Sequence, residues 1–456
     1  MSFTRKRIVH NTLIEALGNG FQDGGVEYSF NYPGFHSNEL HFFLGGDVTS
    51  VNEYCAYSSA WGAAFAGKRS VVSMKNVGLS ACADAFLNSM LLGINAGLVL
   101  VVFDDCDVQH SQCRLDSRHY FDFYGGLWFD PFNIQNAYEI ARNSFKFSEE
   151  FNCPVVIRVT NILYDMNGLF TPISKLQLSV KTFVRSPEKF VVHPMNALKQ
   201  EKALTNRQEK IQSYIENIYP DLSLLSRDIV YGASRNMLAQ DFVQIYTLPI
   251  PLKLFEKTKD ESVCFKIYEH GDAYITEKIR SHAGSSNFKH FSLNASGENF
   301  EYHNRSDFEN LFSLLRNVNN RVICGDLGGF TMDPSRSIDA CLAYGASVSI
   351  AMGVSMASPD RNVFCVCGDA GFKHSAMLVL HEAVQRKLHF SVIVLDNGGS
   401  EGTGGQQIPG NWDNFPKGVT LKHLNFSELK LSGSNIFESS NEDNDTGVKV
   451  FIIKLI

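Results

Sequence analysis

The chain has 456 residues, of which 44% are hydrophobic and 20% are charged, a composition typical of a soluble globular protein. Its formal net charge of −7 gives no basic footprint, so we expect no nucleic-acid partner and no binding to an anionic membrane surface. The length exceeds what one hydrophobic core usually holds, and several domains are therefore expected.

Features of the whole chain also bear on its compartment. Three basic residues near the start are followed by no apolar segment, so we expect no signal peptide. The longest apolar run, "LLGINAGLVLVVF", is too short to cross a bilayer. The ten cysteines follow no regular spacing, which favours reduced thiols. Together these features predict a cytoplasmic enzyme.

Residues 1–185 form the first predicted domain. A helix of small residues, "EYCAYSSAWGAAFAG", leads to the strand "SVVSM", and a further helix leads to the strand "GLVLVVF", which ends at Asp104. Small residues at Ala56, Ala60, Ala63 and Gly67 share one face of the first helix and would let another helix approach closely. Buried alanines that simply favour helix would explain this face almost as well.

Three further blocks follow in chain order. Residues 186–225 are polar and rich in Lys and Glu, which predicts a linker with an exposed helix. Residues 226–300 contain strands such as "DFVQIYTL" and predict a small α/β domain. Residues 301–456 form a second large domain, whose final strand is expected at "VKVFIIKLI".

The last block repeats the order of elements of the first. Small residues on one helix face (Ala343, Ser347 and Ala351) precede the strand "NVFCVC", a Gly-Asp turn, a helix and the strand "HFSVIVL". This agreement predicts a duplicated α/β domain with a parallel sheet, whose helices of small residues pack on each other. Chance agreement stays open, because any βαβ unit has about this length.

Asp369 and Asn397 each follow one of the two apolar strands of this block. A right-handed crossover brings the carboxyl ends of parallel strands to one edge of the sheet, so these residues should lie close together. Carboxylate and amide oxygens suit Mg²⁺, and the turn at Gly371 opens a helix whose free N–H groups can hold a diphosphate. The alternative is that Asp369 caps the helix and that Asn397 begins a simple turn.

The pattern resembles the signature of thiamine diphosphate enzymes, in which a Gly-Asp opening is closed by an Asn after the next strand. More closely, the chain resembles the alpha subunit of indolepyruvate:ferredoxin oxidoreductase, within the 2-oxoacid oxidoreductases. The segments that carry this likeness are "NYPGFHSNEL", "NEYCAYSSAWGAAFAGKRSVVSMKNVGLSACAD", "VVFDDCDVQHSQCRLDSRHY" and "GDAGFKHSAMLVLHEAVQRKLHFSVIVLDNGG".

The resemblance implies a fold of two parallel-sheet domains with a smaller one between them in sequence. Residues 1–185 would bind the aminopyrimidine and residues 301–456 the diphosphate, while residues 226–300 look like a transketolase-C domain. It also implies a homodimer, because in these enzymes the cofactor lies between the two larger domains, often of different chains. The sequence leaves open whether both halves of one site share a chain.

Residue roles follow from the same resemblance. Mg²⁺ would be held by Asp369, Asn397 and the backbone carbonyl of Gly399, with the amides of Ala370 and Gly371 and the Thr403 side chain near the diphosphate. Glu53 falls where the family places the glutamate that hydrogen-bonds N1′ of the aminopyrimidine. On sequence alone, Glu53 is equally an ordinary glutamate in the first turn of a helix.

Several positions depart from the family pattern. Asn76, Gly405 and Ile408 stand where the family has histidines, and Phe35 with His36 replaces its Thr-Pro pair. The family also continues into a ferredoxin-like domain, whereas no C-x₂-C-x₂-C run occurs in this sequence, so electrons could leave only through a partner protein.

These departures leave few candidates for proton transfer and substrate binding. His374 keeps its family position, and His36 is a second candidate for acid–base work, although either could be structural. Phe35, Asn76 and Arg118 are the predicted substrate contacts. Arg118 could pair with a substrate carboxylate, or equally form a structural salt bridge.

The sequence therefore predicts a Mg²⁺- and thiamine diphosphate-dependent enzyme that decarboxylates a 2-oxo acid. A non-oxidative outcome is favoured, with transfer of the acyl-anion equivalent to a second carbonyl or acyl acceptor slightly ahead of simple protonation. One alternative is the catalytic subunit of a 2-oxoacid:ferredoxin oxidoreductase that uses the iron–sulfur clusters of a partner. Another is an inactive scaffold, against which the presence of Glu53, Asp369 and Asn397 speaks.

Overall fold

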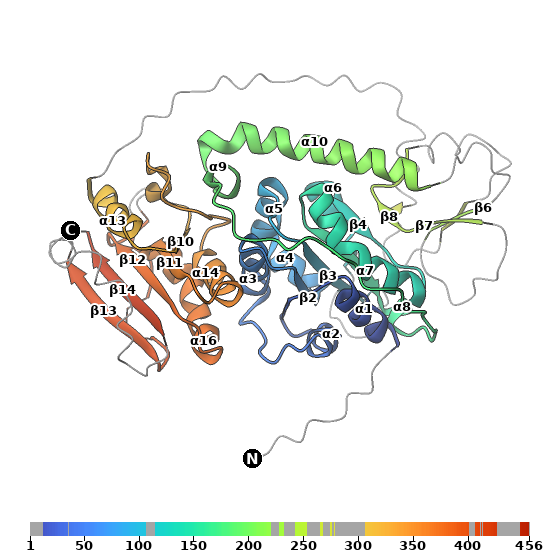
Figure 1. Ribbon diagram of the computed structural model, residues 1–456, viewed down its shortest axis with the longest axis horizontal. Helices are drawn as coiled ribbons and strands as arrows, with labels where there is room; N and C mark the ends of the chain where they lie inside the picture. The colour runs from blue at the N-terminus through green and yellow to red at the C-terminus, as the bar shows by residue number, and fades with distance from the viewer. Residues whose placement is uncertain are drawn as a thin grey trace, which may run out of the picture.

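A computed structural model confirms the α/β class and describes most of the chain. The described residues are 12–34, 36–105, 115–219, 228–231, 242–252, 265–267, 274–275, 278, 306–400, 406–410, 412, 414–425 and 447–455. Their strands form three sheets in which nearly all pairs are parallel, and helices cover the two larger sheets (Figure 1). Among these residues no helix is long and apolar enough to cross a bilayer.

The first sheet lies in the middle of the molecule (Figure 1). Its strand order is β1-β2-β3-β5-β4-β8, with bounds Tyr28–Asn31, Ser70–Lys75, Leu98–Asp104, Val155–Thr160, Leu127–Phe129 and Thr247–Leu248. Its helices are α1 (Thr12–Asp23), α2 (Ser37–Phe43), α3 (Glu53–Phe65), α4 (Asn76–Ala81), α5 (Ala83–Leu92), α6 (His119–Tyr124), α7 (Ile134–Phe151) and α8 (Asn161–Tyr164). Strand β3 is buried along its whole length, as expected for a parallel sheet covered on both faces.

The second sheet is built from the last part of the chain, at the end of the molecule opposite β6 (Figure 1). Its order is β10-β11-β12-β14-β13, with bounds Arg321–Gly325, Asn362–Gly368, Phe390–Asp396, Val448–Lys454 and Val419–Asn425. Its helices include α13 (Ser306–Arg316), α14 (Ser347–Ala357), α15 (Asp369–Gly371) and α16 (Met377–Gln385). Strands β11 and β12 are parallel neighbours, with Gly368 opposite Leu395, so the prediction that they end at one edge is confirmed.

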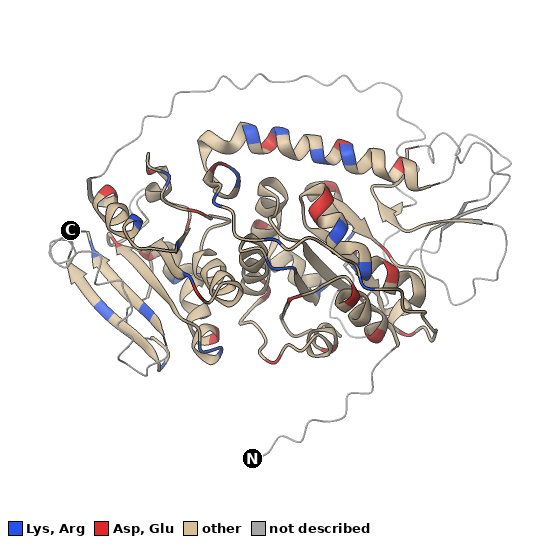
Figure 2. Ribbon diagram, viewed as in Figure 1, with Lys and Arg blue, Asp and Glu red and all other residues tan. Residues whose placement is uncertain are grey.

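The segment predicted as a linker with an exposed helix is largely helical. Helix α9 (Pro187–Phe190) precedes α10 (Pro194–Ile218), which runs along the first sheet's helices α5 and α7. Ile211 and Ile215 on its inner face are buried, whereas its outer face carries charges of both signs (Figure 2). The helix is thus exposed on one side only.

The segment predicted as a small domain is described in part. Strands β6 (Asp228–Tyr231), β7 (Phe242–Ile245) and β9 (Phe265–Ile267) form a parallel sheet in the order β7-β6-β9. Strand β8 lies in the same predicted range but joins the first sheet, antiparallel to β4, with Leu248 opposite Trp128. The composition of a short strand does not show which sheet it joins, because an edge strand can add to a sheet in either direction. The sequence therefore did not reveal that β8 belongs to the first sheet.

The two larger sheets meet where α3 packs on α14, which confirms the predicted contact between helices of small residues. A Cβ atom on Gly62 would lie 2.4 Å from the Ile350 carbonyl oxygen, and one on Gly353 would lie 2.0 Å from the Ser59 carbonyl oxygen. Only glycine lets the two backbones approach this closely. The contact lies within one chain and brings the start of α3 close to the loop that precedes α14.

Candidate active site

The Gly-Asp turn begins one continuous helical run on the second sheet. Helix α15 starts at Asp369, passes through a π-helical turn at Phe372–Ala376 and continues as α16. Single π-turns inside helices often mark functional sites. The Asp369 carboxyl accepts the Ala370 N–H, and burial together with the nearby charge of Asp396 raises the Asp369 pKa.

Three side chains with oxygen atoms, those of Asp369, Asp396 and Asn397, lie where β11 and β12 end. Asn397 follows β12 directly, and the Gly398 N–H donates to the Asp396 carboxylate at 3.2 Å. Among the described residues no group of three or more His, Cys, Asp or Glu side chains could hold a metal by itself. A cation at this edge would therefore rely on one carboxylate, an amide oxygen, a carbonyl and the oxygens of a bound ligand, which is how Mg²⁺ is commonly held.

Glu53 is the first residue of α3 and lies against Gly78 of α4. The helix is capped by Asn52, whose side chain accepts the Cys55 N–H at 2.7 Å, so capping does not require Glu53. A Cβ atom on Gly78 would lie 2.6 Å from Glu53 Cγ, so the glycine lets the Glu53 side chain pack directly on α4. Burial raises the pKa of Glu53, which lets the carboxyl hold a proton at a higher pH than an ordinary glutamate.

A pair of tyrosines connects the two halves of the site. The Tyr54 hydroxyl donates to the Tyr344 carbonyl oxygen at 2.8 Å, across the contact between the sheets. The Tyr344 ring lies edge-on to the His374 ring, with 5.3 Å between centroids, and the Asp369 charge acts on the Tyr344 phenol. These contacts therefore connect the start of α3 with Tyr344 and His374, which lie near the Gly-Asp turn.

Asp326, which the sequence did not single out, is fully buried directly after β10 and beside the Gly-Asp turn. Its Oδ1 atom accepts the N–H groups of Leu327 and Gly345, at 2.8 and 2.7 Å, and its Oδ2 atom accepts the Ser347 hydroxyl at 3.1 Å. A Cβ atom on Gly371 would lie 3.0 Å from Oδ2. The signal was present in the sequence, because "CGDLGG" and "CGDAGF" both follow a strand with Gly-Asp-x-Gly.

We expect Asp326→Asn to flatten the pH dependence of stability. Burial raises the pKa of Asp326 from 3.8 to about 7, so the folded state binds a proton more tightly than the unfolded state. The free energy of unfolding should therefore fall, by at most about 4 kcal/mol, as the pH rises from about 4 to about 7. An asparagine can accept both N–H groups through its carbonyl oxygen and donate from its amide to the Ser347 oxygen, and it does not titrate. Urea unfolding across this pH range checks the difference in slope.

The matched control for this prediction is Asp360→Asn, because Asp360 is an exposed acid at the opposite edge of the same sheet. It should leave the slope of the wild-type protein in place. Equal slopes for the wild-type protein and Asp326→Asn would contradict a raised pKa at Asp326.

The two candidate histidines lie in different surroundings. His374 is next to Tyr344, and its Nδ1 atom lies 2.9 Å from the Ser375 hydroxyl, which donates to the Gly345 carbonyl. His36 has a left-handed backbone (φ 54°), lies 2.8 Å from Glu39 and stacks on Tyr164. The contacts of His374 connect it with the Gly-Asp turn, whereas those of His36 favour a structural role.

Two of the predicted substrate contacts, Asn76 and Arg118, form hydrogen bonds with other residues of the protein. The Asn76 side chain donates to the Leu115 carbonyl at 2.9 Å. Arg118 is 1% exposed and donates from Nε to the Asp116 carboxylate at 2.9 Å, so the geometry favours the structural salt bridge over a substrate contact. Phe35 and Thr403 lie outside the described residues, as does Gly405.

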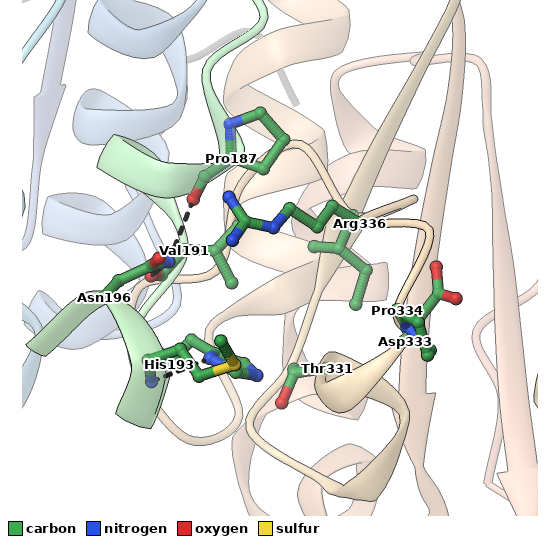
Figure 3. A pocket seen from close by; sticks show the side chains of 10 residues that line it. Pro187, Val191, His193, Asn196, Thr331, Asp333, Pro334 and Arg336 are labelled. Carbon is green, nitrogen blue, oxygen red and sulfur yellow. Dashed lines mark hydrogen bonds between the residues drawn. The ribbon is translucent and has the colours of Figure 1, made fainter. Parts of the chain in front are cut away.

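A pocket of about 210 Å³ lies away from these residues, between the start of α10 and the loop that precedes α14 (Figure 3). Its walls include His193, Asn196, Thr331 and Arg336. None of the predicted site residues lines it, so this pocket does not identify the site.

Comparisons with known proteins agree with this geometry. Residues 326–433 match the family described as "Thiamine pyrophosphate enzyme, C-terminal TPP binding domain". The chain is 26% identical to "Indolepyruvate oxidoreductase subunit IorA" of Methanothermobacter thermautotrophicus, over 85% of this chain and 75% of that protein. It is 24% identical to the subunit of the same name from Archaeoglobus fulgidus, over 87% of this chain and 76% of that protein.

Solved structures show the same fold. The thiamine diphosphate-dependent 4-hydroxybenzoylformate decarboxylase of Rhodococcus jostii RHA1 aligns with a TM-score of 0.57 and 14% identity, over 97% of this chain and 98% of that one. The benzoylformate decarboxylase of Polynucleobacter necessarius aligns with a TM-score of 0.54 and 12% identity, over 98% of each chain. Residues 326–433 therefore match a thiamine pyrophosphate-binding domain, the chain as a whole is similar in sequence to IorA subunits, and it shares the fold of these two decarboxylases.

Proposed function

We propose that the protein uses Mg²⁺ and thiamine diphosphate to remove CO₂ from a 2-oxo acid and passes the resulting acyl-anion equivalent to a carbonyl or acyl acceptor or to a proton. The observation that carries this proposal is the packing of α3, which begins at the half-buried Glu53, on α14 of the sheet that bears the Gly-Asp turn, with the Tyr54 hydroxyl bound to the Tyr344 carbonyl. The names of its relatives and structural neighbours support the class of chemistry.

The residues present fit the proposed cofactor. Gly78 packs directly against the Glu53 side chain, where a Cβ atom would collide with Cγ, and Glu53 stays partly exposed, so a ring nitrogen could reach its carboxyl. At the other half, a Cβ atom on Gly368 would meet nothing within 4 Å, so the turn is open in front of the helical run. The N–H groups at the start of that run favour an anion such as diphosphate.

Each residue has a defined task in this proposal. Asp369, Asn397 and the Gly399 carbonyl would hold Mg²⁺, and the amides of Ala370 and Gly371 would bind the diphosphate, with Thr403 nearby. Glu53 would hold a proton at the carboxyl that faces N1′ of the aminopyrimidine, which its raised pKa favours. The bound thiazolium would supply the electron sink for CO₂ loss.

The proposal has a non-oxidative and an oxidative version, which differ in what accepts the acyl-anion equivalent or its electrons. In the non-oxidative version, a second carbonyl compound, an acyl donor or a proton accepts the acyl-anion equivalent and no electron acceptor is needed. The relatives named as oxidoreductase subunits favour oxidation instead, with electrons passed to the clusters of a partner protein. His374, the exposed histidine nearest Tyr344, is the candidate proton donor in the non-oxidative version.

Product analysis by mass spectrometry tests the proposal. The enzyme, with Mg²⁺ and thiamine diphosphate, is incubated with a panel of 2-oxo acids, each with and without an aldehyde or acyl-thioester acceptor. We expect CO₂ and an aldehyde or a ligation product without any electron acceptor. Viologen reduction that requires the oxo acid and coenzyme A would support the oxidative version, and no CO₂ from any 2-oxo acid would contradict both.

Homodimer formation is part of the proposal, as the resemblance to thiamine diphosphate enzymes implies. Light scattering of the protein with and without the cofactor checks the prediction, and we expect the mass of two chains in both conditions.

A further inference from the structure

The loop that precedes Glu53 is held from both sides of the site. Residues 48–52 are the last part of the connection from α2 to α3, and the Ser50 N–H donates to the Asn31 carbonyl at the end of β1, at 2.9 Å. On the other side the loop contacts α16, the end of the helical run that begins at Asp369. Any shift of this loop moves the first residue of α3, which is Glu53.

The contacts to α16 form a buried charged cluster. The Glu382 carboxylate accepts the Ser50 hydroxyl at 3.1 Å and the Val51 N–H at 3.2 Å. Arg386, one turn further along α16, donates to Glu382 at 2.9 Å and to the Val48 carbonyl at 2.7 Å. Glu382 is 1% exposed and the Arg386 side chain 9%, so water cannot replace these bonds without exposing the cluster.

We propose that Glu382 and Arg386 are positioning residues that fix the Glu53 carboxyl relative to the Asp369 turn. This inference rests on the proposed function, in which Glu53 and Asp369 contact opposite ends of one cofactor. A buried ion pair is seldom needed for stability alone, since well-packed apolar residues would serve as well. This ion pair binds one side chain and two backbone groups of a single loop. Three bonds to one loop fix its orientation as well as its position relative to α16.

The test compares Glu382→Ala, the isosteric Glu382→Gln and the control Glu149→Ala. Glu149 is a matched carboxylate, because it accepts from Arg69 at 2.7 Å and from the Gly97 N–H at 3.1 Å, and its side chain is only 11% exposed. It joins β2 to α7 and has no part in the proposed site. Each holoenzyme is assayed for kcat and KM with the best 2-oxo acid, for thiamine diphosphate affinity with Mg²⁺, and for amide hydrogen exchange.

We expect Glu382→Ala to lower kcat by about 10- to 100-fold, because small displacements of a catalytic group have costs of this order. KM and the affinity for thiamine diphosphate should change by less than about threefold, since binding at the Asp369 turn is kept. Glu382→Gln, which can still accept from the loop, should retain more activity than Glu382→Ala. Amides 48–53 should exchange faster in Glu382→Ala and at the wild-type rate in Glu149→Ala.

Two results would overturn the inference. One is a kcat for Glu382→Ala no lower than that of Glu149→Ala, and the other is wild-type exchange at amides 48–53 in Glu382→Ala. The exchange measurement needs no substrate. It can therefore contradict the positioning role of Glu382 and Arg386 independently of the proposed function. Faster exchange in a protein that releases no CO₂ from any 2-oxo acid would refute the proposed function and leave the positioning of the loop in place.

Discussion

Replacing Glu53 by glutamine should lower kcat by at least about 100-fold, a typical cost of losing an acid–base group. Glutamine fills the same volume beside Gly78 and can still hydrogen-bond a ring nitrogen, but it cannot hold and release a proton. The affinity for thiamine diphosphate should therefore stay close to that of the wild-type enzyme. Steady-state CO₂ release and calorimetric titration with the cofactor measure the two quantities.

The control for this variant is Glu149→Gln, a substitution of another mostly buried carboxylate of the first sheet's helices. It should leave kcat within about twofold of wild type, in the range expected for a residue outside the site. Wild-type turnover in Glu53→Gln would remove Glu53 from its proposed task, and loss of cofactor binding in that variant would assign it to binding instead.

Replacing Asp369 by alanine should abolish Mg²⁺-dependent retention of thiamine diphosphate while the fold survives. Asp369 is the one carboxylate among the three proposed ligands of the cation. Loss of an outer-shell partner already costs metal sites about 10- to 100-fold in affinity, so loss of this ligand should cost more. Its side chain supports little else, because its carboxyl accepts from its own N–H and from that of the adjacent Ala370.

Calorimetry with thiamine diphosphate, with and without Mg²⁺, measures this effect, and circular dichroism with thermal unfolding checks the fold. Asp360→Ala is the matched control, since it removes an exposed carboxylate at the other end of β11. Undiminished Mg²⁺-dependent binding by Asp369→Ala would place the cation elsewhere in the protein.

Local sequence patterns predicted the parts of this structure that depend on neighbouring residues. The parallel arrangement of β11 and β12 follows from an apolar run, a Gly-Asp turn, a helix and a second apolar run. The contact of α3 with α14 follows from small residues at helical spacing, with Gly62 and Gly353 at the closest approach.

Contacts between distant residues could not be predicted in this way. The Tyr344 backbone carbonyl accepts a hydrogen bond from the Tyr54 hydroxyl. A pattern of side chains in the sequence cannot predict a bond to a backbone group so far along the chain. Glu382 is an ordinary helical glutamate in the sequence and acquires its place only when α16 packs on the loop before α3. For Arg118 the partner Asp116 is only two residues away, but the sequence could not show that the pair is buried.

The sequence also could not reveal which histidine belongs to the site. His374 and His36 both occupy positions that the family resemblance makes plausible. The structure separates them, because His374 lies against Tyr344 whereas His36 is stacked on Tyr164. The role of His374 as a proton donor stays a prediction.

The central claim is that one bound thiamine diphosphate connects the Glu53 carboxyl to a cation at the Asp369 turn. A crystal structure of the protein grown with Mg²⁺ and thiamine diphosphate tests it most directly. We expect Glu53 within hydrogen-bond distance of N1′ of the aminopyrimidine, and a cation bound by Asp369, Asn397 and diphosphate oxygens. A Glu53 side chain directed away from the ring, or a cofactor bound without contact to Asp369, would contradict the claim.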